Sequence, residues 1–218
     1  MIDVDATAAA ARERRRTWML GGALLAASAL LMLALRNLPF VFGVVSPPDL
    51  LFAAGAVVFA FGLGRAGSVV ARERLGTTAI VGLAVWLLLV PALLLTLLPT
   101  VPPDASDDIL FSAMVSVTSE VVALILALIG VTRVGRVAVV PRPWRWAPLW
   151  ALLVVAGVHV LRSGFLFGQH GLDQEMLVTL DGLGVLLEAV AVGFLGVIAM
   201  ILAARAAPGS TTVYSSGA

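Results

Sequence analysis

The sequence predicts an all-α, polytopic integral membrane protein. Of its 218 residues, 61% are hydrophobic and only 12% are charged, whereas soluble domains carry roughly 45–50% apolar and about 25% charged residues. Several apolar runs also reach the ~20 residues that a helix needs to cross a bilayer. We therefore expect one membrane domain without a separate soluble domain.

Six apolar segments are separated by short loops rich in Pro, Arg or Asp. The expected organisation is a cytoplasmic lead over 1–17, a membrane domain over 18–204 with spans at 18–35, 49–64, 77–98, 109–131, 147–167 and 176–204, and a disordered cytoplasmic tail over 205–218. The first apolar run is longer than the 7–15-residue core of a signal peptide, so we interpret it as an uncleaved span. Pro91 should kink the third span.

The arginines indicate how these spans are oriented. The chain has no lysine, and in a six-span arrangement twelve of its fourteen basic residues fall on one side. Only Arg36 and Arg162 fall elsewhere. Because basic loops stay on the cytoplasmic side, we expect both termini to be cytoplasmic and the protein to be a multi-pass protein of the plasma (inner) membrane.

The last three spans carry ionisable residues far from their ends. At a rise of about 1.5 Å per residue, Glu120 and Glu188 lie near the bilayer midplane with His159 slightly above them, and Arg162 and Asp181 share the outer third. A charge at the bilayer centre costs at least ~2.5–3.5 kcal/mol. These groups are therefore expected to face inward between spans 4, 5 and 6.

A polar stripe on span 4 points in the same direction. Ser112, Ser116, Ser119 and Glu120 recur at spacings of three and four residues, which places them on one helical face. Four glycines in span 6 are expected to permit close helix packing rather than to bind a ligand; they are Gly182, Gly184, Gly193 and Gly196.

Several interpretations of these residues remain open. Arg162 and Asp181 can form an interhelical ion pair, snorkel to the interface, or contact an anionic headgroup or substrate. Glu120, His159 and Glu188 can form a hydrogen-bonded clamp with at least one carboxyl protonated, or a site for proton relay or a coupling ion. A metal site of two carboxylates and one imidazole is less favoured, because no ligand-spacing motif accompanies it.

Other chemistry finds little support in the sequence. Without cysteine there is no thiol catalysis or thiolate metal site. No G-x-S-x-G or H-E-x-x-H motif indicates a hydrolase, and His159 and His170, separated by a helix end, cannot bracket a haem. We expect no metal, no cofactor and no nucleic-acid partner. The expected partners are the lipid bilayer and a small ion, proton or amphiphile, and the oligomeric state is left open.

The C-terminal part of the chain, from Arg162 to Gly209, resembles the fungal lipid-translocating exporters, the heptahelical RTA-like membrane proteins. The residues that carry the resemblance are Arg162-Ser163, Gly168, Asp181, Glu188 and Pro208-Gly209. The two acids stand in the reverse of the family's usual order, and Phe165 and Leu166 occupy the region of its second Arg and following Glu. The resemblance implies a six-span relative lacking the family's first helix, with lipid or amphiphile handling as its function.

Together these features favour a membrane protein of transport type, not an enzyme. In this hypothesis Glu120 and Glu188 exchange protons, His159 relays them, and Arg162 with Asp181 forms an outer gate. The alternative is a non-catalytic structural or accessory subunit whose polar residues hold the bundle together. A membrane-embedded enzyme acting on lipid is the third hypothesis.

Overall fold

The computed structural model describes residues 4–36, 45–64, 67–70, 73–97, 106–137, 140, 144–167 and 174–205. Within these ranges the secondary structure consists of six α-helices: α1 (Val4–Leu35), α2 (Pro47–Phe61), α3 (Arg74–Leu97), α4 (Ser106–Arg136), α5 (Ala147–Phe167) and α6 (Gln174–Arg205). The prediction of an all-helical fold is confirmed. Each predicted span overlaps one of these helices, although the predicted span 49–64 extends three residues beyond the end of α2.

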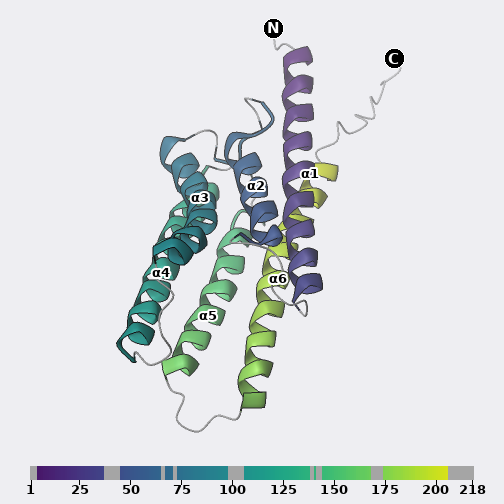
Figure 1. The fold of residues 1–218 in the computed structure, drawn as a ribbon. Helices are drawn as coiled ribbons and strands as arrows, with labels where there is room; N and C mark the ends of the chain where they lie inside the picture. The colour runs from purple at the N-terminus through teal and green to yellow at the C-terminus, as the bar shows by residue number, and fades with distance from the viewer. Residues whose placement is uncertain are drawn as a thin grey trace, which may run out of the picture.

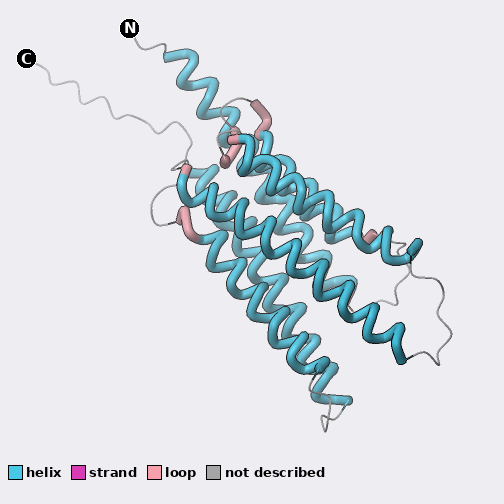
Figure 2. Tube along the Cα trace, turned by 90° about the vertical axis from the view of Figure 1, so that its left-hand side faces the viewer, coloured by secondary structure: helices cyan, strands magenta, loops and turns pink. Residues whose placement is uncertain are grey.

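The helices form a ring in chain order. Each helix packs against the next, and α1 closes the ring by packing along α6 (Figures 1 and 2). Neighbours run antiparallel. Gly22 and Ala29 of α1 lie against Gly196 and Gly193 of α6, in reverse order. Likewise, Ile80 of α3 lies against Gly130 of α4, and Trp86 bonds to Ser119. The contact between α4 and α5 is the smallest of the six.

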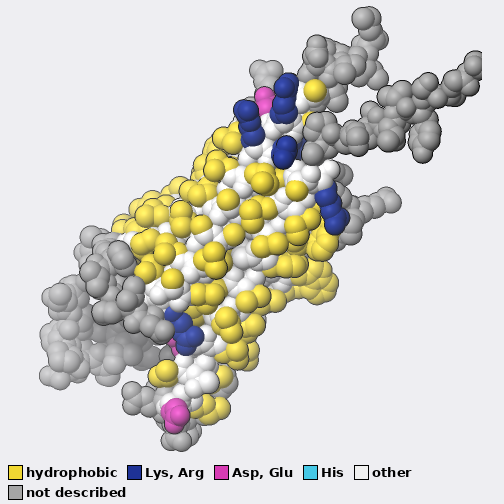
Figure 3. All heavy atoms as spheres, turned by 90° about the vertical axis from the view of Figure 1, so that its right-hand side faces the viewer, with side chains coloured by type: hydrophobic (Ala, Val, Ile, Leu, Met, Phe, Trp, Pro, Cys, Tyr) yellow, Lys and Arg dark blue, Asp and Glu magenta, His cyan; other side chains and the backbone are white. Residues whose placement is uncertain are grey.

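The exterior of the ring is that of a membrane protein. Four stretches are long and apolar enough to cross a membrane, namely Ala8–Leu35, Arg74–Leu93, Met114–Arg136 and Val178–Arg205, while α2 and Ala147–Leu161 in α5 are shorter apolar helices. Large hydrophobic side chains are exposed along every helix. Figure 3 shows them covering the middle of one face, with basic side chains gathered at the end where α1 begins. We call this end of the bundle the basic end.

The helix ends depart from the predicted spans mainly at the N-terminus. Residues 4–17, expected as a separate lead, continue the helix of the first span. Ala, Arg and Glu dominate this stretch, and because they are strong helix formers the helix has no reason to stop before the membrane segment. Residues 206–218, most of the expected tail, lie outside the described ranges.

The packing of α1 on α6 depends on small residues. A Cβ atom on Gly196 would lie 2.6 Å from the Gly22 carbonyl oxygen and 2.7 Å from the Ala26 backbone nitrogen, and one on Gly193 would lie 3.4 Å from the Ala29 Cβ. The two backbones can approach this closely only because a side chain is missing at the contact. The packing role predicted for Gly196 is thus confirmed, whereas an added Cβ at Gly193 would make only an ordinary van der Waals contact.

Two glycine substitutions are expected to change the stability of the protein in opposite directions, because only one of the two glycines lies at this close approach. Gly196→Ala should lower stability by about 1–3 kcal/mol, because its methyl group overlaps backbone atoms of α1 that cannot rotate away. Gly157→Ala on α5 has no atom within 4 Å of the added Cβ, and it should leave stability unchanged or raise it by up to ~1 kcal/mol through helix propensity. Thermal unfolding of both variants in one detergent tests this. Equal melting temperatures would contradict the close packing.

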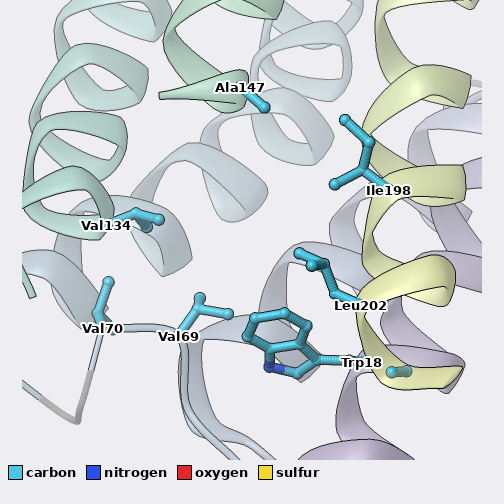
Figure 4. Packing of buried hydrophobic residues seen from close by; sticks show 8 residues of the cluster. Trp18, Val69, Val70, Val134, Ala147, Ile198 and Leu202 are labelled. Carbon is cyan, nitrogen blue, oxygen red and sulfur yellow. The ribbon is translucent and has the colours of Figure 1, made fainter. Parts of the chain in front are cut away.

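The basic end of the ring is filled by a hydrophobic cluster, drawn in Figure 4. Its buried members are Trp18, Val69, Val70, Val134, Ala147, Ile198, Leu202 and Ala203. Val69 and Val70 come from the α2–α3 connection, which folds back so that the Val69 N–H donates to the Phe59 carbonyl at 3.1 Å. We call this group the basic-end cluster. It closes the interior of the ring at that end.

Polar contacts hold the α2–α3 connection in this position. The Thr17 hydroxyl is fully buried, accepts a hydrogen bond from the Leu63 N–H at 2.8 Å and donates to the Glu13 carbonyl at 3.0 Å. Arg133 in α4 forms an ion pair with Glu73 at the far end of the connection. The connection is thereby linked to both α1 and α4.

Candidate functional site: a cavity inside the helix ring

Between the helices of the ring lies a partly open cavity of about 490 Å³, within the ~300–1,000 Å³ range of small-molecule sites. All six helices contribute to its wall, each through residues spaced three or four apart along one face. In α6, for example, Glu188 begins a stripe that continues through Val192, Leu195 and Ala199 to Leu202. This stripe lies beside the small-residue stripe that packs on α1.

Most of the wall is apolar, and the polar side chains on it are few. Four of them are titratable: Asp49 from α2, Glu120 from α4, His159 from α5 and Glu188 from α6. The hydroxyls of Ser28 and Ser119 also contribute. Among the described lining residues there is no arginine, so the charged groups of the wall are carboxylates and one imidazole.

These polar groups share one level of the bundle. Measured along their own helices from the basic end, Asp49, Glu120 and His159 each lie about 18–24 Å in, at a rise of about 1.5 Å per residue. Glu188 lies about 25 Å in by the same measure. The cavity therefore has a polar belt at mid-depth, between the basic-end cluster and the opposite end of the bundle.

Asp49 reaches this level because α2 begins inside the bundle. The Ser28 hydroxyl, buried in α1, donates a hydrogen bond of 2.8 Å to the Pro48 carbonyl. The contact places the first turn of α2 about 10 Å short of the end of α1. Ser46 caps this turn, donating to the Asp49 carboxylate and accepting from the Asp49 N–H at 3.3 Å.

The imidazole of His159 is oriented by its own helix. Its Nδ1 lies 2.9 Å from the Val155 carbonyl oxygen. A carbonyl oxygen only accepts hydrogen bonds, so Nδ1 must carry the proton in this contact. In the neutral ring Nε2 is then the nitrogen that can accept a proton. His159 thus combines a fixed orientation with a basic atom on the cavity wall.

Glu120 occupies a different environment. The indole N–H of Trp86 donates to the carbonyl of the preceding residue, Ser119, at 3.2 Å, which ties α3 to α4 at this level. The Glu120 carboxylate itself has no hydrogen bond or ion pair with any residue that the structure describes. Among the carboxylates of the belt, Glu120 is therefore the one that a proton or a ligand cation can bind without displacing a protein group.

The predicted site residues divide into two groups. Glu120, His159, Glu188 and Ser119 line the cavity together. Ser116 is one turn farther along α4, is exposed and is not among the described residues of the cavity wall.

Of the predicted outer pair, Asp181 does not line this cavity. Asp181 is exposed and absent from the wall, and the side chain of Arg162 lies outside the described residues, as do Gly168 and His170. The described arginine closest to this part of α6 is Arg36 at the end of α1. Its guanidinium lies against Gly182, so that a Cβ atom there would overlap it.

The interior site is wider than predicted. We expected every deep ionisable group on spans 4–6, whereas α2 adds Asp49 and α1 adds Ser28. The signal that could have located Asp49 was the length of the second predicted span. At 16 residues and about 24 Å it is shorter than a ~30 Å hydrocarbon core, so one of its ends must lie at depth.

Within the described part of the chain, no three His, Cys, Asp or Glu side chains come close enough to share one metal ion. The four titratable residues are therefore distributed around the cavity wall and do not converge on a point. No family model, curated protein or solved structure matches this chain.

Proposed function

We propose that the protein is a six-span transporter of the plasma (inner) membrane, with both termini in the cytoplasm, that takes an amphiphile into the cavity of its helix ring. The closed ring of antiparallel helices supports six crossings. The described arginines other than Arg36 gather at the basic end, which supports a cytoplasmic location for that end.

The observation that carries the proposal is the composition of the cavity wall. A cavity of about 490 Å³ lined by Leu, Val, Ala and aromatic side chains can bury the apolar part of a ligand. The polar belt at mid-depth offers a small number of groups for its polar part. A bundle that served only as a structural subunit would have no need to keep such a volume empty, since packed interiors hold few voids larger than a water molecule.

The belt also supports coupling to protons. Glu120 has no partner among the described residues, and His159 presents Nε2 as a proton acceptor. In this proposal Glu120 releases a proton when the polar group of a ligand takes its place, and it binds a proton again when the ligand leaves. The proposed ligands include lipids, because the resemblance to the lipid-translocating exporters implies lipid or amphiphile handling.

Proteoliposomes with an entrapped pH dye test this proposal. Addition of a panel of cationic, zwitterionic and anionic amphiphiles should produce proton flux that empty liposomes lack. Glu120→Gln should reduce that flux at least about tenfold, because the amide cannot exchange a proton. Glu175→Gln is the control, since Glu175 is exposed at the start of α6 and outside the cavity.

The same experiment separates the two alternatives. A well-folded wild-type protein without flux for any amphiphile would favour a structural subunit. Failure of the double variant Glu120→Gln, Glu188→Gln to assemble would further support a structural role for these residues. A membrane enzyme would instead form product from labelled lipid extract.

A further inference from the structure

We infer that the ligand of the cavity is a hydrophobic cation, with Glu120 as its counter-charge; the inference rests on the proposed function and specifies its substrate class. Three features of the wall select this class over neutral and anionic amphiphiles. They are the sign of the charged groups, the aromatic side chains, and the position of Glu120.

The first feature is electrostatic. The charged groups on the wall are the carboxyls of Asp49, Glu120 and Glu188, together with His159, and the described wall contains no arginine. In a low-dielectric interior a carboxylate without a counter-ion is costly. A ligand cation lowers this cost, whereas an anion raises it. The cavity therefore discriminates by charge before any specific contact is made.

The second feature is the aromatic content of the wall. Five aromatic rings from three helices and the α4–α5 connection line the cavity: Trp18, Phe52, Phe59, Trp86 and Trp144. The face of an aromatic ring attracts a cation, and quaternary ammonium groups are bound in proteins by such rings. Aromatic rings also pack well against the apolar substituents of a hydrophobic cation. Carboxylates and rings together match both parts of this ligand class.

The third feature assigns the counter-charge to Glu120. Asp49 already accepts a hydrogen bond from Ser46, and Glu188 also has an interaction partner. Glu120 has none among the described residues, and Trp86 lies beside it through the bond to Ser119. A proton and the ligand cation then compete for one carboxylate. The other titratable groups facing this space are Asp49 on α2, His159 on α5 and Glu188 on α6; α3 faces it with Trp86 and α1 with Ser28.

Calorimetric titration of the purified full chain in an uncharged detergent tests the inference. The probes are tetraphenylphosphonium and tetraphenylborate, which have nearly the same size and shape and opposite charge. We expect saturable binding of the phosphonium and none of the borate. Glu120→Gln should weaken phosphonium binding at least about tenfold, while Glu175→Gln should leave it unchanged.

A pH series on the wild-type protein gives a second readout that does not depend on a variant folding. Competition predicts that the apparent dissociation constant rises as the pH falls, by up to about tenfold per pH unit. A pH-independent constant, or unaltered binding by folded Glu120→Gln, would overturn the assignment to Glu120. Equal binding of both probes would overturn the charge selectivity and leave the proposed function standing. Binding of neither probe, together with no flux for any amphiphile, would count against the proposed function itself.

Discussion

Ala191→Trp will abolish ligand binding while the fold remains intact. Ala191 lies on the cavity stripe of α6, with 6% of its surface exposed. Its side chain borders the cavity, so an indole ring added there takes up part of the cavity volume. The ring removes a large part of a cavity of about 490 Å³, and a ligand the size of tetraphenylphosphonium no longer fits.

The neighbouring residue supplies a matched control. Val190 is 58% exposed on the outer face of α6, so Val190→Trp places the same ring in the lipid. We expect Ala191→Trp to weaken phosphonium binding by more than about tenfold and Val190→Trp to have no effect. The melting temperature of Val190→Trp should stay near the wild-type value, because its ring displaces no packed atoms. The melting temperature of Ala191→Trp is measured alongside, so that loss of binding is scored only in folded protein. Wild-type affinity in Ala191→Trp would show that the ligand binds elsewhere.

The sequence was most informative where hydrophobicity and length decide the structure. Spans such as 147–167 are bounded by turn-forming or charged residues, and the helix observed there begins and ends at the predicted positions. The cost of deep charges likewise predicted that Glu120, His159 and Glu188 would face the interior, and they line one cavity. Such arguments need only the bilayer and one helix at a time.

Features that depend on how helices are placed against each other could not be predicted in this way. Asp49 was assigned to a span end, because the short length of its segment shows that one end lies at depth but does not show which one. Ser28 provides that information through its bond to Pro48, twenty residues away. Ser116 shares a helical face with Glu120, yet it is exposed and does not line the cavity. Periodicity assigns a face, whereas depth within a cavity depends on the neighbouring helices.

The burial of the α2–α3 connection could likewise not be predicted from the sequence. Its residues 65–74 resemble an ordinary polar loop with three arginines, and nothing marked Val69 and Val70 as core residues. Two adjacent valines became buried because Gly62, with φ at +70°, turns the chain back at the end of α2. A Cβ atom at Gly62 would lie 2.5 Å from the Ser68 backbone nitrogen. Only glycine satisfies both conditions there.

Val70→Asp is therefore expected to be the most damaging single substitution at the basic end. Val70 is fully buried, with 0% of its surface exposed, and it packs in the basic-end cluster. A carboxylate there must either remain unpaired in apolar surroundings or pull the connection out of the ring. Either outcome costs several kcal/mol, out of the ~5–15 kcal/mol that stabilise a typical fold.

Leu63→Asp is the control, because Leu63 belongs to the same connection and is 49% exposed. We expect Val70→Asp to aggregate or to elute as a broad peak in size-exclusion chromatography, whereas Leu63→Asp should elute as the wild type does. If Val70→Asp folds normally but its liposomes leak protons without ligand, the cluster acts as a closed gate over the cavity. If it folds normally and does not leak, the basic-end cluster neither stabilises the ring nor seals it.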